Sequence, residues 1–106
     1  MRELGLLHAR LQQWDDALPW LQRAVQTAPG SVVDRCALVE TLVARDEALG
    51  TPPAGLPDDV AGHLGAAFHL HPAHPRVAAL LERLGPRFGT DLAAHFRTQP
   101  VATQFQ

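Results

Sequence analysis

Apolar residues recur at intervals of three and four along most of the chain, whereas alternating apolar and polar residues are nearly absent. Residues at these intervals share one face of an α-helix, so the pattern predicts helices rather than strands. The predicted helices cover residues 2–12, 15–28, 32–49, 57–70, 75–84 and 90–98. Most of the turns between them are short, which favours antiparallel helix pairs. The sequence therefore predicts an all-α fold.

Residues that prefer helix ends support these boundaries. Asp15–Asp16 supply carboxylates for the N-cap of the second helix, and Pro19 is tolerated if it lies in the first turn. Ser31 is expected to cap the third helix, with Asp34 at the spacing of a capping box. Gly50 is expected to end that helix.

Proline and glycine divide the second half of the chain. The segment GTPPAGLP at 50–57 is predicted to be a rigid connection without regular structure. Pro75 and Gly85–Pro86 are expected to bracket the fifth helix. Thr90–Asp91 is expected to start a short sixth helix, and residues 99–106 form a polar tail.

Two helices differ in how their apolar residues are distributed. The expected apolar face of the first helix comprises Leu4, Leu7, His8 and Leu11. The third helix is apolar on nearly every side, which predicts deep burial or an interface. Trp14 is expected in the core, and Trp20, which points in another direction, is a candidate interface contact.

Composition limits the classes of function. The chain has 106 residues, which is room for one small domain, and its net charge of −2 predicts no attraction for nucleic acid or anionic membrane. The single Cys36 cannot form an internal disulfide, which suits a reducing cytoplasm. No apolar run reaches the roughly 18 residues of a membrane span. We expect a cytoplasmic protein that binds neither nucleic acid nor membrane.

Four histidines, at His63, His69, His71 and His74, fall within twelve residues and raise the possibility of a zinc site. Their spacing matches no common zinc motif, Pro72 stiffens the turn, and no cysteine or nearby carboxylate completes a ligand set. We interpret them as surface histidines and expect no metal and no cofactor.

The sequence also contains no convincing catalytic set. Cys36 and His8 could form a nucleophile and base, but an isolated cysteine usually packs as a small hydrophobe. Acidic pairs lie at helix ends, where the helix dipole explains two of them. Ser31 is the only serine and is expected to be a helix cap. We therefore expect no catalytic residues and no enzyme activity.

Residues 1–31 keep a fixed spacing of small and large side chains. The positions that carry it are Met1, Leu4, Gly5, His8, Ala17, Leu21, Ala24 and Pro29. Five match the pattern of one repeat family directly, whereas Met1, His8 and Leu21 replace its aromatic residues. The segment thus resembles a tetratricopeptide repeat, in which small residues let two helices cross closely. The resemblance implies that the repeat is packed together by Leu4, Gly5, His8, Trp14, Ala17, Leu21, Ala24 and Pro29.

Residues 32–74 resemble a degenerate second repeat. Its equivalent positions are Leu38, Leu42, Val60, Leu64, Ala67 and Pro72. Val39 stands where the family has a small glycine, and 50–57 is an insertion between the paired helices. Residues 75–98 are expected to form capping helices, followed by the tail at 99–106. The resemblance implies stacked helix pairs in a short α-solenoid with terminal caps.

The resemblance also implies a function. Tetratricopeptide proteins are generally non-catalytic adaptors or scaffolds that hold a peptide or helix of another protein in a concave groove. The groove positions carried over by spacing are Arg2, Leu6, Ala9, Arg10, Val33, Cys36, Glu40 and Val43. One subclass clamps a terminal carboxylate with an asparagine, but this chain has no asparagine and places Leu6 at that position.

Two other interpretations stay open. About three repeats are usually needed for independent stability, so self-association through leucine and tryptophan faces would complete a short stack as a homo-oligomer. Alternatively, the chain is an accessory repeat segment of a larger enzyme, which agrees with its start inside the first predicted helix.

Overall fold

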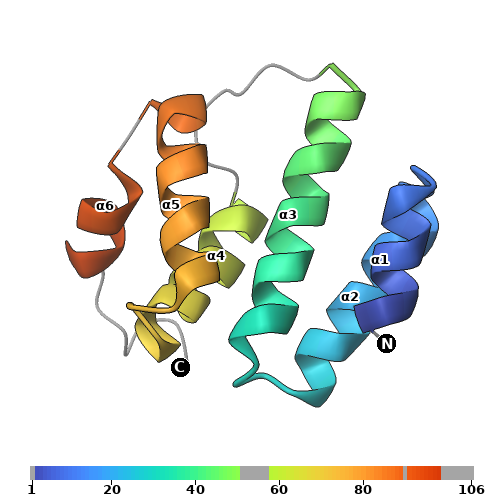
Figure 1. Cartoon of the computed structure of the whole chain (residues 1–106), viewed down its shortest axis with the longest axis horizontal. Helices are drawn as coiled ribbons and strands as arrows, with labels where there is room; N and C mark the ends of the chain where they lie inside the picture. The colour runs from blue at the N-terminus through green and yellow to red at the C-terminus, as the bar shows by residue number, and fades with distance from the viewer. Residues whose placement is uncertain (1, 51–57, 90, 99–106) are drawn as a thin grey trace.

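The computed structural model describes residues 2–50, 58–89 and 91–98. This part of the chain is all-α, and its helices are α1 (Arg2–Arg10), α2 (Trp14–Thr27), α3 (Val32–Ala48), α4 (Asp58–Leu70), α5 (Pro75–Phe88) and α6 (Leu92–Thr98). Figure 1 shows α1, α3 and α5 on the near face, with α2 and α4 behind them and α6 beside α5. None of the described helices is long and apolar enough to cross a membrane.

The other helices are arranged around α3, which contacts α1, α2, α4 and α5. Its most buried apolar side chains, each at most 4% exposed, are Cys36, Ala37, Leu38, Val39, Leu42 and Val43. They point in several directions around the helix, because a run of consecutive residues covers a full turn. Of the two alternatives predicted for this helix, deep burial or an interface, the structure shows deep burial, and its nearly continuous apolar sequence follows from this position.

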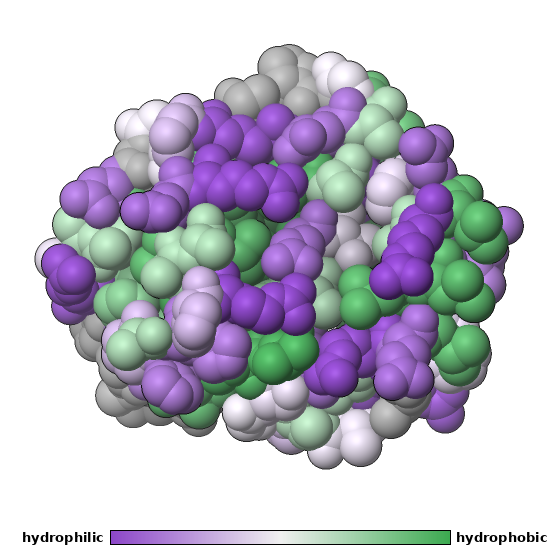
Figure 2. Space-filling model, in the orientation of Figure 1, coloured by the Kyte–Doolittle hydropathy of each residue, from purple (hydrophilic) through white to green (hydrophobic). Residues whose placement is uncertain are grey.

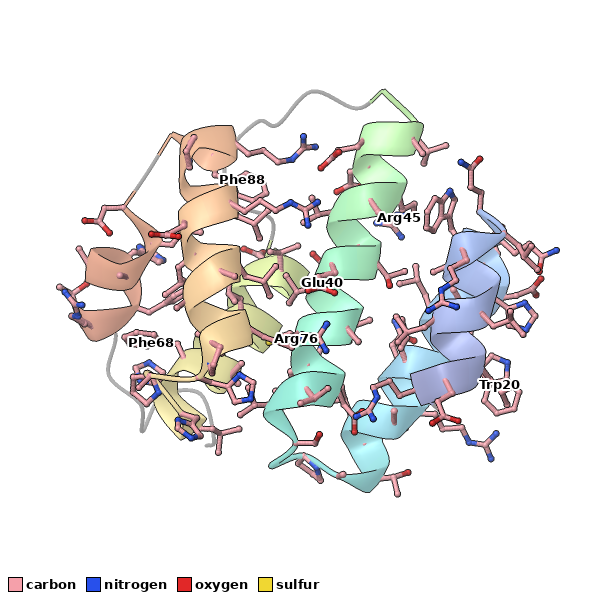
Figure 3. All side chains as sticks on the ribbon, viewed as in Figure 1. Trp20, Glu40, Arg45, Phe68, Arg76 and Phe88 are labelled. Carbon is pink, nitrogen blue, oxygen red and sulfur yellow. The ribbon has the colours of Figure 1, made fainter. Side chains whose placement is uncertain are left out.

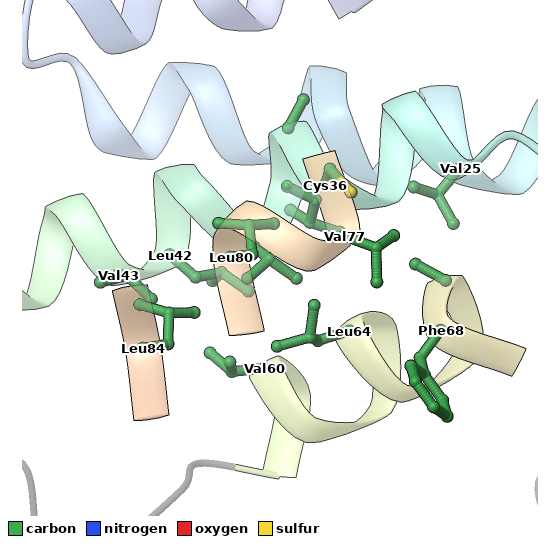
Figure 4. Close-up of a cluster of buried hydrophobic side chains, with 14 of the residues drawn as sticks. Val25, Cys36, Leu42, Val43, Val60, Leu64, Phe68, Val77, Leu80 and Leu84 are labelled. Atoms are coloured by element: carbon green, nitrogen blue, oxygen red, sulfur yellow. The ribbon is translucent and has the colours of Figure 1, made fainter. Parts of the chain in front are cut away.

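The core continues from α3 into the second half of the chain, as Figure 4 shows for the side chains between α3, α4 and α5. The largest buried contributions from α4, α5 and α6 are Val60, Leu64, Phe68, Val77, Leu80, Leu84, Leu92 and Phe96. The rings of Phe68 and Phe96 lie 6.0 Å apart, centroid to centroid, so α6 is attached to α4 through an aromatic contact. Phe96 is fully buried, which explains how a seven-residue helix keeps its place.

A close approach at Gly5 sets the packing of α1 on α2. A Cβ atom at Gly5 would lie 2.6 and 2.8 Å from two side-chain carbons of Leu21, and 3.2 Å from the carbonyl oxygen of Ala17. Leu21 and Ala17 are themselves fully buried, so neither can move aside easily. The small residue expected at this helix crossing is therefore required by the geometry.

Several predicted helix ends are confirmed. The Ser31 hydroxyl accepts a hydrogen bond from the Asp34 amide at 3.3 Å and caps α3. Gly50 follows the end of α3 with a φ of 69°, a conformation that glycine adopts without steric cost. Pro75 occupies the first turn of α5, and His74 is the N-cap residue.

Two helix boundaries differ from the predictions. α2 begins at Trp14, so Asp15–Asp16 lie in its first turn instead of at its N-cap. Pro19 consequently lies in the second turn and removes one internal hydrogen bond. α5 continues through Gly85–Pro86 to Phe88, because burial of the surrounding apolar side chains outweighs the single hydrogen bond lost at the proline.

The first helix buries a different face from the one predicted. Leu4, Leu7 and Leu11 are 44%, 50% and 59% exposed, because the close contact at Gly5 turns the opposite side of α1 toward α2. The expectation that Leu4 packs the repeat is thus wrong. α1 also ends at Arg10, earlier than predicted.

The remaining residues expected to pack the repeat divide into two groups. Ala17, Leu21 and Ala24 are buried as expected. His8 and Trp14 are only half-buried, and Pro29 is exposed. Trp14 is the first residue of α2, directly after the α1–α2 turn, where its side chain is only partly covered. The predictions for Met1, Thr90, the greater part of the 50–57 connection and the 99–106 tail fall outside the described residues.

Substituting Gly5 tests the close crossing of α1 and α2. We expect Gly5→Ala to lower the free energy of unfolding by about 1–3 kcal/mol, because the methyl group overlaps a buried leucine. Gly62→Ala is the matched control, since a Cβ at this helical glycine has no neighbour within 4 Å. This control should gain about 0.5–1 kcal/mol from reduced backbone entropy of the unfolded chain. Urea unfolding followed by circular dichroism measures both, and equal effects would contradict the predicted crossing.

Candidate functional site

A hollow of about 300 Å³ opens on the face formed by α1, α3 and α5. Its lining residues are Leu6, Ala9, Arg10, Trp14, Glu40, Thr41, Ala44 and Arg83. We call this hollow, defined by these residues, the α1–α3–α5 groove. Figure 3 shows the side chains on this face, with Glu40 between α3 and α5.

Helical spacing explains how the groove is assembled. Leu6 and Arg10 are one turn apart on α1, and Glu40 and Ala44 are one turn apart on α3, so each pair faces the same side. The short side chains of Ala9 and Ala44 leave space between the two helices. The hollow therefore exists because alanines occupy positions where two helices approach each other.

Ion pairs connect α3 with α5 along this face. The Arg76 guanidinium lies 2.8 Å from the Glu40 carboxylate, and Figure 3 shows the two side chains meeting between the helices. Arg83 and Arg87 lie 3.9 and 3.8 Å from the same carboxylate oxygen of Glu47. These pairs are partly exposed, so each contributes at most about 1 kcal/mol to stability. They link α3 to α5 across this face.

The charge that the groove offers to a ligand is positive. Glu40 is already neutralised by Arg76. Arg10 is exposed and forms no ion pair within the described residues, while Arg83 has a single long contact and a 56% exposed side chain. Beside these cations lie apolar surfaces of Leu6 and Trp14. The arrangement suits a segment that carries both apolar and acidic side chains.

The eight predicted groove residues are not all in one place. Leu6, Ala9, Arg10 and Glu40 line the groove. Arg2 instead forms an ion pair at 3.1 Å with Asp34. Val33 is half-buried and is not among the groove-lining residues. Asp34, at 8% exposed, is one of two buried polar residues in the described chain, and its pairing with Arg2 ties α1 to the first turn of α3.

Cys36 and Val43 do not line the groove, which corrects the prediction for both. Their exposed fractions are 0% and 1%, because both point toward the core formed with α4 and α5. Burial is the main reason that the pKa of the Cys36 thiol is raised above its ordinary value. A raised pKa disfavours the thiolate, so this position behaves as a packed apolar residue.

Sequence reasoning missed four groove residues, namely Trp14, Thr41, Ala44 and Arg83. Ala44 is one turn from Glu40 and could have been found by extending that spacing along the third helix. Arg83 is seven residues from Arg76, which is two helical turns, and the repetition is the available signal. The hydroxyl of Thr41 donates to the Ala37 carbonyl at 2.9 Å, which explains why this polar residue tolerates burial.

A larger hollow of about 500 Å³ lies between α5 and α6. Its lining residues are Leu81, Glu82, Gly85, Pro86, Gly89, Asp91, Leu92 and Ala93. The Asp91 carboxylate accepts a hydrogen bond from the Ala94 amide at 3.2 Å and serves as a helix cap. Apart from the carboxylates of Glu82 and Asp91 the described lining is uncharged and holds no cation, so this hollow offers less varied chemistry for recognition than the groove does.

The histidines do not converge on a metal site within the described residues, where no group of three potential ligands lies close enough. The rings of His71 and His74 are in edge contact, 5.5 Å between centroids. The Nδ1 of His74 accepts a hydrogen bond from the Arg76 amide at 3.2 Å. His63 lies apart from them, where its Nδ1 is 3.3 Å from the Arg35 guanidinium.

Comparison of the chain with family models, with curated protein sequences and with solved structures found no match in any of the three.

The burial of His63 beside Arg35 predicts a pH dependence of stability. Burial, and then the charge of Arg35, lower the pKa of His63 below its ordinary value of 6.5, against an opposing effect of Asp59. Below pH 6.5 the unfolded chain takes up this proton before the folded chain does. Stability should therefore fall as the pH drops from 6.5 through the lower pKa of the folded state.

Urea unfolding between pH 7.5 and 5 measures this effect. We expect His63→Gln to reduce the loss of stability at low pH, because the variant removes the group whose proton uptake is disfavoured. His71→Gln is the control, since His71 is exposed. A profile of His63→Gln that is as steep as that of the wild type and of the control would show that His63 is not responsible.

Proposed function

We propose that the chain is a non-catalytic protein-interaction module that binds an extended or helical segment of another protein in the α1–α3–α5 groove. The observation that carries the proposal is that alternate helices, α1, α3 and α5, contribute to one hollow that combines apolar groups with two exposed arginines, Arg10 and Arg83. Stacked helix pairs of the tetratricopeptide type place alternate helices on one face in this way, so the resemblance of residues 1–31 supports the same function.

The groove suggests the chemistry of its ligand. An apolar side chain would fill the space beside Leu6 and Trp14, removing apolar surface from water on both partners. A carboxylate of the ligand would pair with Arg10 and Arg83 at the edge. We therefore expect binding to weaken as salt concentration rises, because these cations are solvent-exposed.

The proposal assigns no chemical step to the chain. Cys36, the one thiol, is buried with a raised pKa, and His8 contacts the side chain of Gln13 at 2.8 Å. These observations favour binding over catalysis. A cytoplasmic location is part of the same proposal, since a single unpaired cysteine suits a reducing compartment.

Selection of peptides from a random display library, followed by fluorescence anisotropy on the best sequences, tests the proposal. Selected peptides should combine apolar with acidic residues and bind with a measurable dissociation constant. Arg83→Glu should weaken binding about 3- to 30-fold, because it replaces a cation in the groove by an anion. Arg97→Glu, an exposed arginine on α6 that is not among the groove-lining residues, is the matched control and should bind as the wild type does.

A second variant tests the apolar part of the groove. Ala44→Trp should fill the hollow and reduce binding at least about tenfold, whereas Ala94→Trp on the exposed side of α6 should not. Circular dichroism and urea unfolding check that each variant is folded. Peptides that bind Arg83→Glu and Ala44→Trp as tightly as the wild type would show that the groove is not the binding site.

A further inference from the structure

The outer side of α1, away from α3, exposes an apolar stripe. Leu4, Leu7 and Leu11 are 44–59% exposed, and Figure 2 shows hydrophobic side chains gathered at the edge of the molecule where α1 lies. The Leu11 amide bonds to the Leu7 carbonyl at 3.3 Å, so the helical path continues through all three residues. Intervals of three and four make the stripe continuous along the helix.

This stripe is not used by the described fold. α1 packs on α2 through Gly5 on a different face, and its contacts to α3 run along the groove side. Three neighbouring exposed leucines on one face of a short helix leave contiguous apolar area in water. Such an area is unusual on a surface that contacts no other protein.

Charges beside the stripe indicate what covers it. Glu3 and Arg10 are both exposed, lie on the same flank of the leucines, and form no ion pair within the described residues. They are seven residues apart, at opposite ends of the helix. Two such helices packed antiparallel would bring Glu3 of each chain near Arg10 of the other, because residues on the same flank meet in an antiparallel pair.

We propose that the outer side of α1 is an interface between two copies of this chain, with their α1 helices packed antiparallel about a two-fold axis. Leu7 lies at the axis against its own copy, and Leu4 faces Leu11 of the second copy. The contact is self-complementary, as a two-fold interface requires. Two ion pairs between Glu3 and Arg10 fix the antiparallel direction.

Trp20 extends the same surface. It is half-buried on α2, and Figure 3 shows it on the outer side of the α1–α2 pair, beside α1 and away from α3. Tryptophan at the edge of an apolar contact is a frequent anchor of protein interfaces. The second copy would therefore also cover part of this ring.

The size of the surface sets the expected affinity. α1 has nine residues and is about 14 Å long, which is short for an interface. The buried area would fall below the roughly 800 Å² per partner of a standard stable complex. We therefore expect a dimer that dissociates on dilution, with a dissociation constant of about 10 μM or weaker.

Sedimentation equilibrium of the whole chain from about 5 μM to 1 mM tests the proposal. The mass should rise from one chain toward two across this range. Leu7→Glu places two like charges at the axis and should weaken association at least about tenfold. Leu70→Glu is the matched control, because Leu70 is a similarly exposed leucine on α4, and it should associate as the wild type does. Circular dichroism confirms that both variants are helical.

Charge reversal tests the antiparallel arrangement. Glu3→Arg alone and Arg10→Glu alone should each weaken association about 3- to 10-fold, since each replaces two attractive pairs by two repulsive ones. The double variant restores opposite charges and should recover the wild-type constant. A wild-type chain that stays monomeric up to 1 mM, or a dimer that Leu7→Glu leaves intact, would overturn the interface. Failure of the double variant to recover would overturn the antiparallel packing.

The leucine stripe lies outside the proposed peptide groove, whereas Arg10 belongs to both surfaces, because it lines the groove and would pair with Glu3 of the second copy. If the chain binds peptide but stays monomeric, the groove is supported and the dimer interface is overturned. If the chain dimerises but binds no peptide, the dimer interface is supported and the groove is overturned. Leu7→Glu is not among the groove-lining positions, so it separates the two directly.

Discussion

Burial of α3 on nearly all sides is the constraint on which the rest of the molecule depends. One small domain has little interior volume, and this helix occupies its centre, in contact with four of the other five helices. Every neighbour is positioned by what it places against α3. The remaining apolar side chains of α4 and α5 then need only reach this one helix to be buried.

The same helix also carries part of the groove. Glu40 and Ala44 are only partly buried and line the groove together with the buried Thr41, next to core residues such as Leu42 and Val43 on the same helix. A site built on a packed helix keeps its geometry better than one built on a loop. The geometry of the groove is therefore sensitive to substitutions in the core behind it, because these would displace the residues that line it.

Much of the fold was predictable because helix periodicity and end signals are local. Ser31 and Pro75 act within one turn of the chain, and both marked helix starts correctly. The predictions failed where packing decides between two local options. α1 has leucines on one side and Gly5 on another, and steric fit at the glycine, not the number of leucines, determines which side is buried. Pro86 stays helical for a similar reason.

The groove was predictable in part. Spacing within single helices found Leu6, Arg10 and Glu40, because residues on one face of a helix follow from sequence alone. Arg83 depends on how α5 lies beside α3, and the core position of Cys36 depends on where α4 and α5 approach. Those placements come from tertiary packing, which a single sequence does not contain.

The sequence order of the contacting helices has a consequence for the speed of folding. Within the described residues, every pair of helices in contact is either adjacent in the chain or separated by one helix. Among these helices no contact joins α1 or α2 to α5 or α6, so little loop entropy is lost before contacts form. Helical proteins with such local topology fold in microseconds to milliseconds. The N-terminal half can accordingly assemble on α3 as soon as that helix is available, before the C-terminal helices are in place.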